Sequence, residues 1–176
     1  MEQAMWKMVD SCLSKEELGS LARYTLEKYP SFLDINELPP TQQKITEVVK
    51  QSYNLETCAL VEQWHNNPKY GYYPTEHLDK DEPLWEETGE IRLPLCSAIL
   101  YVMVDSLVGA NLEVSNDNIP IDIDYMPKFE NIDTIVPEEG KIVLLDPGVW
   151  HKVTDYVSGR RVALILNFWD KPLYNP

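Results

Sequence analysis

The spacing of hydrophobic residues along the chain changes near residue 55. Before this point, apolar residues recur three or four positions apart, which places them on one face of a helix. One such stripe is Leu18, Leu21, Ala22 and Leu26, and the other is Ile45, Val48 and Val49. We therefore expect residues 1–54 to form a helical layer.

Polar residues and prolines mark the ends of these two helices. Ser14 and Glu17 stand three positions apart and fit a capping box at the start of the first helix. Tyr29-Pro30 is expected to end that helix, because proline cannot continue it. The turn at Pro39-Pro40 leads into the second helix.

After residue 55 the helical period disappears. Short apolar stretches take its place, separated by Pro, Gly, Asn and Asp residues, a pattern typical of strands joined by turns. These stretches are 57–61, 97–104, 112–114, 141–145, 149–157 and 162–169. The polar residues 116–133 read as an irregular loop between strands. Helices followed by many short strands predict an α+β chain, mainly β, in which helices pack on a sandwich or barrel over residues 55–176.

Composition limits the partners of this chain. A length of 176 residues fits one domain, 1–176, and a formal net charge of −14 disfavours nucleic acid as a partner. No apolar run approaches the roughly 20 residues needed to cross a bilayer, and the N-terminus lacks the pattern of a signal peptide. We therefore expect no membrane partner. Three widely spaced cysteines indicate a reduced, cytoplasmic protein.

Two histidines and an aspartate form a candidate metal site. On a strand, His77 and Asp79 would point to the same face. His151, on a distant strand, would complete a set of two histidines and one carboxylate that leaves coordination positions open. Non-haem Fe(II) oxygenases use this set. Each residue alone is weak evidence, because most isolated histidines are structural or solvated.

Several motifs around these residues occur in a fixed order. They are His77-Leu78-Asp79, Pro137 to Gly140, His151, Val153, Gly159 and Arg161. In this order and spacing, residues 70–169 resemble the 2-oxoglutarate- and Fe(II)-dependent dioxygenases, particularly their prolyl-4-hydroxylase-like branch. Two positions depart from the family pattern: Ala110 replaces the second glycine of a Gly-Gly-x-Leu segment, and Tyr156 replaces a valine. Neither is a metal-ligand position.

The resemblance implies a double-stranded β-helix (a cupin-like jelly roll) with the N-terminal helices packed on its larger sheet. It implies that His77, Asp79 and His151 hold Fe(II), which 2-oxoglutarate chelates. Arg161 would bind the far carboxylate of 2-oxoglutarate, in preference to Arg160, which would face the other side of the strand. A tyrosine often assists this arginine, and the candidates are Tyr70, Tyr72 and Tyr101.

The implied reaction is the oxidative decarboxylation of 2-oxoglutarate by O2, which gives succinate and CO2 and hydroxylates a substrate C–H bond. The substrate would be an amino acid, a peptidyl side chain or a small metabolite. Asp79 argues against halogenation, because a halide needs the coordination position of the carboxylate.

Three alternatives stay open on the sequence. A nucleic-acid demethylase shares a similar stretch at residues 77–82, but that group has a further arginine where this chain has Asn167. A non-catalytic domain could keep the barrel, and a cupin-like metalloenzyme could use the metal without 2-oxoglutarate. His65 lies outside the pattern and reads as a surface or loop histidine.

Overall fold

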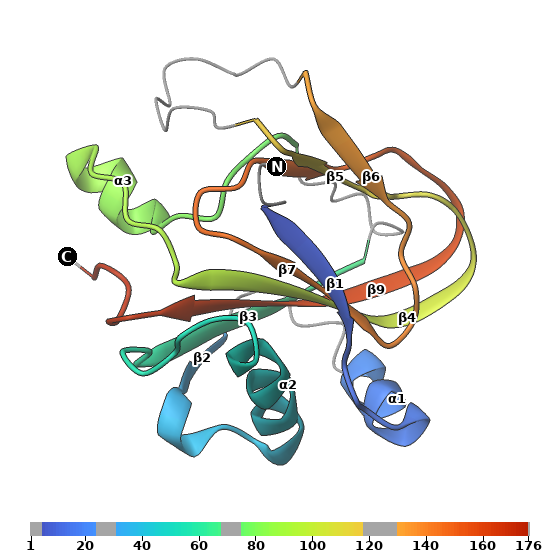
Figure 1. The fold of residues 1–176 in the computed structure, drawn as a ribbon, viewed down its shortest axis with the longest axis horizontal. Helices are drawn as coiled ribbons and strands as arrows, with labels where there is room; N and C mark the ends of the chain where they lie inside the picture. The colour runs from blue at the N-terminus through green and yellow to red at the C-terminus, as the bar shows by residue number, and fades with distance from the viewer. Residues whose placement is uncertain (1–4, 24–30, 68–74, 118–129, 176) are drawn as a thin grey trace.

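Two antiparallel sheets form the centre of the protein, as the computed structural model shows for residues 5–23, 31–67, 75–117 and 130–175 (Figure 1). The larger sheet contains, in spatial order, β1 (Trp6–Asp10), β7 (Lys141–Leu145), β4 (Cys96–Gly109), β9 (Tyr156–Trp169), β3 (Leu60–Asn66) and β2 (Ser31–Asp34). The smaller sheet contains β6 (Ile132–Ile135), β5 (Leu112–Ser115) and β8 (His151–Val153).

The apolar residues of the larger sheet alternate between two cores, because successive side chains on a strand point to opposite faces. Ile99 and Tyr101 of β4 and Ile165 of β9 face inward and pack with Leu112 and Val114 of the smaller sheet. This core lies between the two sheets. The arrangement is the mainly β jelly roll that the sequence predicted.

Helices cover the outer face of the larger sheet. Figure 1 shows α1 (Lys15–Arg23) and α2 (Pro40–Lys50) on the side away from β5 and β6. Ile45 and Val49 of α2 are fully buried in one cluster with Leu100 of β4. The predicted helical layer on the larger sheet is thereby confirmed.

The predicted capping box is present at the start of α1. The backbone N–H of Ser14 donates to Glu17 Oε2 over 2.8 Å, and the backbone N–H of Glu17 donates to Ser14 Oγ over 3.2 Å. Both bonds satisfy backbone groups that the helix itself leaves unpaired. The expected stop at Tyr29-Pro30 lies outside the described residues.

Four elements differ from the expectation. Strands β1 and β2 lie within the segment 1–54 that was expected to be helical, and both form edges of the larger sheet. Strand β6 begins inside the expected loop 116–133. After Asp79, in the part of the chain where no helix was expected, lies a short helix, α3 (Glu82–Thr88), whose first turn is capped by Asp81. A 3₁₀ turn, η1 (Ile35–Glu37), joins β2 to α2.

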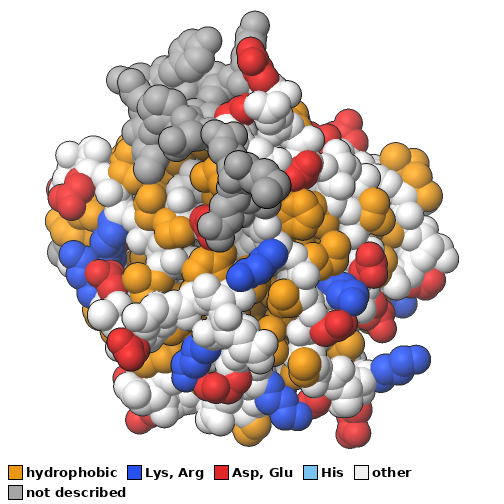
Figure 2. All heavy atoms as spheres, viewed as in Figure 1, with side chains coloured by type: hydrophobic (Ala, Val, Ile, Leu, Met, Phe, Trp, Pro, Cys, Tyr) orange, Lys and Arg blue, Asp and Glu red, His pale blue; other side chains and the backbone are white. Residues whose placement is uncertain are grey.

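In the part of the chain that the structure describes, no helix combines the length and the apolar character needed to cross a membrane. On the face shown in Figure 2, acidic and basic side chains are interspersed among hydrophobic ones.

Packing of α2 on the sheet should contribute strongly to stability. We expect Ile45→Ala to lower the free energy of unfolding by about 2–5 kcal/mol, because it removes a fully buried side chain and leaves a cavity. Urea unfolding measures this change. The exposed Glu47→Ala on the same helix is the control and should shift the free energy by roughly 0.5 kcal/mol or less. Equal changes in the free energy of unfolding for the two variants would contradict the packing of Ile45 against the sheet.

Candidate metal centre

The backbone brings the two predicted histidine ligands side by side. His77 pairs with His151 of β8 in an isolated antiparallel bridge. The N–H of His77 donates to the carbonyl of His151 over 3.0 Å, and the reverse bond measures 2.8 Å. Asp79 follows in a segment without strand pairing, so the expectation that a regular strand carries both His77 and Asp79 was wrong.

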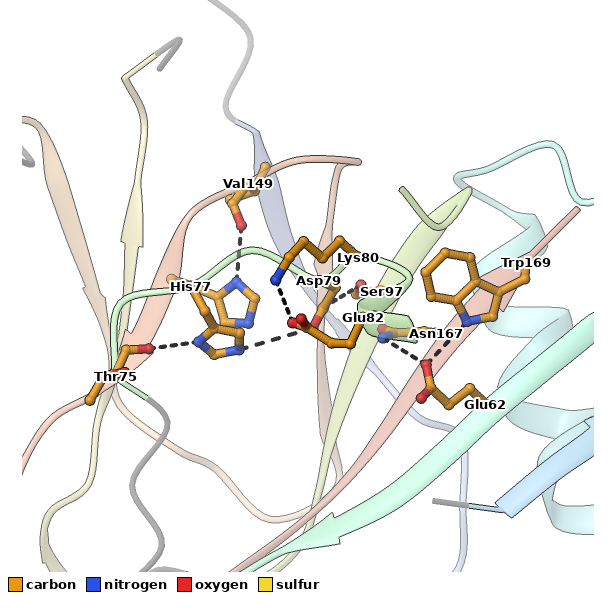
Figure 3. Close-up of polar contacts among 11 residues, drawn as sticks. Glu62, Thr75, His77, Asp79, Lys80, Glu82, Ser97, Val149, Asn167 and Trp169 are labelled. Atoms are coloured by element: carbon orange, nitrogen blue, oxygen red, sulfur yellow. Dashed lines mark hydrogen bonds and ion pairs between the residues drawn. The ribbon is translucent and has the colours of Figure 1, made fainter. Parts of the chain in front are cut away.

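The three side chains nevertheless converge. One ligating atom from each of His77, Asp79 and His151 lies within 4.8 Å of the others, so the three could hold a metal ion. The centres of the two imidazole rings are 4.3 Å apart and their planes are tilted by 54°. His77 Nε2 is 4.0 Å from Asp79 Oδ1 (Figure 3).

Backbone carbonyls orient both imidazole rings. His77 Nδ1 lies 2.6 Å from the carbonyl oxygen of Thr75, and His151 Nδ1 lies 3.0 Å from that of Val149. Because a carbonyl oxygen only accepts, each Nδ1 carries the hydrogen and donates it. Each Nε2 therefore keeps a lone pair for a metal, as in metal sites generally.

Burial keeps His151 neutral. Burial, together with the neighbouring His77, lowers the pKa of this imidazole to about 4, although Asp79 and the carbonyl of Val149 act in the opposite direction. At neutral pH the ring is therefore uncharged, which is the form that binds a metal. The side chain of His77 is 35% exposed, whereas that of Asp79 is 10% exposed. The site thus opens to solvent beside His77.

A hydrogen bond fixes the carboxylate of Asp79. Ser97 Oγ, on β4, donates to Asp79 Oδ2 over 2.6 Å, which leaves Oδ1 directed toward the two histidines. The donor set is then two neutral imidazole nitrogens and one carboxylate oxygen. This set, with coordination positions left over, fits iron(II).

Arg161 is buried in the core between the sheets, whereas its neighbour Arg160 is exposed. The side chain of Arg161 is 2% exposed and donates from Nη1 to Asn66 Oδ1 of β3 over 2.7 Å. Its guanidinium carbon lies 5.3 Å from the centre of the Tyr101 ring. Alternation along β9 thus separates the two arginines, as the sequence predicted.

The buried guanidinium has unused hydrogen-bonding capacity. Neither Arg161 Nε nor the hydroxyl of Tyr101 has a hydrogen-bond partner among the described residues. No described Asp or Glu forms an ion pair with Arg161 either. Burial lowers the pKa of Arg161 and raises that of Tyr101. A buried cation without a carboxylate partner fits an anionic ligand group.

The remaining sequence candidates fall outside this constellation. Tyr70 and Tyr72 lie outside the described residues, so Tyr101 is the tyrosine that the structure places beside Arg161. His65 lies within β3, not in a loop, and is not part of the metal-ligand cluster.

Two supporting residues, Asn66 and Ser97, were missed. Their roles depend on which strands pair with which, and no local signal in the sequence marks them.

No family model and no curated protein sequence matches this chain. Solved structures do match its fold. A prolyl-4-hydroxylase from Pseudomonas putida aligns with 95% of this chain and 86% of its own, at 15% identity and a TM-score of 0.62. The chain has the fold of the 2-oxoglutarate- and Fe(II)-dependent oxygenases.

Structures of two further proteins support this assignment of the fold. HygX from Streptomyces hygroscopicus, solved with iron bound and with nickel and 2-oxoglutarate bound, aligns over 94% of this chain and 82% of its own. Its identity is 12% and its TM-score 0.60. A 2OG-Fe(II) oxygenase family oxidoreductase from Burkholderia pseudomallei aligns over 95% of this chain and 86% of its own, at 10% identity and a TM-score of 0.56.

The bond from Ser97 to Asp79 should matter for metal binding. We expect Ser97→Ala to weaken Fe(II) binding roughly 10–100-fold, because loss of a partner that orients a ligand typically costs this much. Anaerobic metal titration measures the affinity. The exposed Ser158→Ala on β9 is a matched control and should bind Fe(II) as the wild type does. Unchanged affinity in Ser97→Ala would contradict the role of this bond.

Proposed function

We propose that this chain is a single-domain Fe(II)- and 2-oxoglutarate-dependent dioxygenase that hydroxylates a C–H bond and releases succinate and CO2. The observation that carries the proposal is the pairing of a His77–Asp79–His151 cluster with a buried, incompletely bonded Arg161 in the same barrel. The first fits the metal and the second fits an anion. The likeness in fold to a prolyl-4-hydroxylase supports the combination.

In this proposal His77 Nε2, His151 Nε2 and a carboxylate oxygen of Asp79 hold iron(II). The carbonyls of Thr75 and Val149 and the hydroxyl of Ser97 keep these ligands in place before the metal arrives. A site ordered in advance binds its metal with less entropic cost. When bound, iron and 2-oxoglutarate together supply the oxidising power for hydroxylation, using O2.

Arg161 binds the far carboxylate of 2-oxoglutarate. Its guanidinium offers a planar fork of N–H donors, which matches the two oxygens of a carboxylate. Tyr101 can donate its hydroxyl hydrogen to the same carboxylate, since no described residue accepts it. Because Arg161 is only 2% exposed, little water competes for its guanidinium, and the ion pair is stronger than it would be in solvent.

The substrate class in the proposal is an amino acid, a peptidyl side chain or a small metabolite, and not nucleic acid. Free, buried thiols at Cys58 and Cys96 support a reducing, cytoplasmic setting.

Succinate formation tests the proposal. Purified protein supplied with Fe(II), 2-oxoglutarate and air should release succinate, even slowly and without substrate, and omission of Fe(II) should stop this release. Metal binding without any succinate, in the presence of a broad set of amino acids and peptides, would contradict the proposal and favour a cupin-like or non-catalytic role.

A further inference from the structure

A row of polar side chains crosses the inner face of the larger sheet and ends at the metal cluster. Asn167 of β9 lies opposite Glu62 of β3 on one side and opposite Ser97 of β4 on the other. Ser97 in turn donates to Asp79. Figure 3 shows these residues leading from His77 and Asp79 toward Glu62.

The row contains hydrogen-bond acceptors that lack donors. Asn167 Nδ2 and Trp169 Nε1 both donate to Glu62 Oε2, over 3.4 Å and 3.2 Å, and no described residue donates to Glu62 Oε1. Asn167 is 2% exposed, and its Oδ1 has no partner among the described residues. Ser97 cannot supply one, because its single hydroxyl hydrogen is directed to Asp79.

The positively charged side chains of Lys80 and Arg92 interact with residues other than Glu62. Lys80 pairs with Glu82 and lies 4.4 Å from the centre of the Trp85 ring. Arg92 pairs with the buried Asp81. Among the described residues, Glu62 therefore has no positively charged partner.

Burial is the main factor that raises the pKa of Glu62, and the negative charge of Asp79 adds to this effect. A half-buried carboxylate without a counter-ion is costly, and a cation beside it would remove that cost.

We propose that Glu62 and Asn167 bind the ammonium group of a small primary-amine substrate while the amine's carbon chain extends toward the metal cluster. This inference rests on the proposed function, which places the reacting C–H bond at His77, Asp79 and His151. An ammonium group carries a charge and three N–H donors, which suits one carboxylate oxygen and one amide oxygen.

The dimensions and the walls of the row agree with such a substrate. Neighbouring strands lie about 4.8 Å apart, so the Cα atoms of Glu62 and Ser97, two strands apart, are separated by roughly 9.6 Å. A short aliphatic chain spans this distance. Trp64, two residues from Glu62 on the same strand, packs against the inner core and offers an apolar wall for the chain.

Binding of two simple probes tests the inference. Ligand-observed NMR titrations would give the dissociation constants of n-pentylamine and 1-pentanol, first for metal-free protein and then anaerobically with Fe(II) and 2-oxoglutarate. We expect the amine to bind at least tenfold more tightly than the alcohol. Equal affinities in both states would overturn the inference.

Two variants test whether Glu62 and Asn167 are responsible for the tighter binding of the amine. Glu62→Gln keeps the size of the side chain and can still accept from Trp169 and Asn167, but it should lose most of the preference for the amine. The exposed Glu47→Gln on α2 is the matched control and should keep it. Asn167→Leu removes the second acceptor and should weaken amine binding several-fold without weakening that of the alcohol. An unchanged preference in Glu62→Gln and Asn167→Leu would overturn the assignment.

Failure of this inference differs from failure of the proposed function. Succinate formation without a preference for the amine would support the oxygenase function and contradict the amine-binding subsite. A preference for the amine without succinate formation would support the subsite and contradict the oxygenase function.

Discussion

His151→Ala is expected to abolish Fe(II)-dependent succinate formation while leaving the fold intact. The imidazole of His151 supplies one of three metal ligands, and its loss should cost more than the roughly 10–100-fold effect of losing a residue that merely orients a ligand. The fold should survive, because the backbone of β8 still pairs with β5. His77→Ala should behave in the same way. Succinate release and circular dichroism measure the two properties.

The third histidine of the chain provides a matched control. His65 lies on β3, outside the metal-ligand cluster, so His65→Ala should retain Fe(II) binding and turnover. If His77→Ala and His151→Ala both kept wild-type turnover, the assignment of the metal centre would be wrong.

Arg161→Ala is expected to weaken 2-oxoglutarate binding by roughly 30-fold or more while Fe(II) still binds. Removal of one partner of a buried, charge-assisted pair costs about 2–5 kcal/mol. Arg161 meets this condition, because its side chain is 2% exposed and no described acid neutralises it. The concentration of 2-oxoglutarate that half-saturates succinate formation measures the effect.

Arg161→Lys separates the contribution of the planar guanidinium donors from that of the positive charge, and Arg160→Ala is the control. Arg161→Lys keeps the charge but loses the planar pair of donors, so its affinity for 2-oxoglutarate should lie between those of the wild type and Arg161→Ala. Arg160→Ala changes the exposed neighbour and should have no effect. A loss of affinity in Arg160→Ala alone would reverse the assignment.

Buried strands were predictable from the sequence where apolar residues form an uninterrupted run. The predicted strand 141–145 has the same bounds as β7. Four of its five residues are buried, and turns at Gly140 and Pro147 flank it. Strands β1 and β2 were missed because they are short edge strands. Each is held by pairing with a partner distant in sequence, β7 or β3. A hydrophobic pattern contains no information about such pairing.

Helix α3 was missed for a different reason. Seven residues are too few to show a helical period, but the ends carry recognisable signals. Asp81 accepts from the N–H of Leu84 as an N-cap, and Gly89 adopts a left-handed conformation (φ 74°) after the last turn.

The sequence named the single residues of the candidate site that the structure brings together. Motif order singled out His77, Asp79 and His151, and alternation along β9 separated Arg161 from Arg160. The residues that hold or extend the site, Asn66, Ser97 and Glu62, were not predictable. They meet their partners only through the register of β3, β4 and β9.

Anaerobic titration of the metal-free protein with Fe(II) and then 2-oxoglutarate tests the central claim most directly. We expect a weak visible charge-transfer band that requires both additions, is absent from His151→Ala, and needs far more 2-oxoglutarate in Arg161→Ala. Absence of the band from wild-type protein that has bound Fe(II) would contradict a joint site for iron and 2-oxoglutarate.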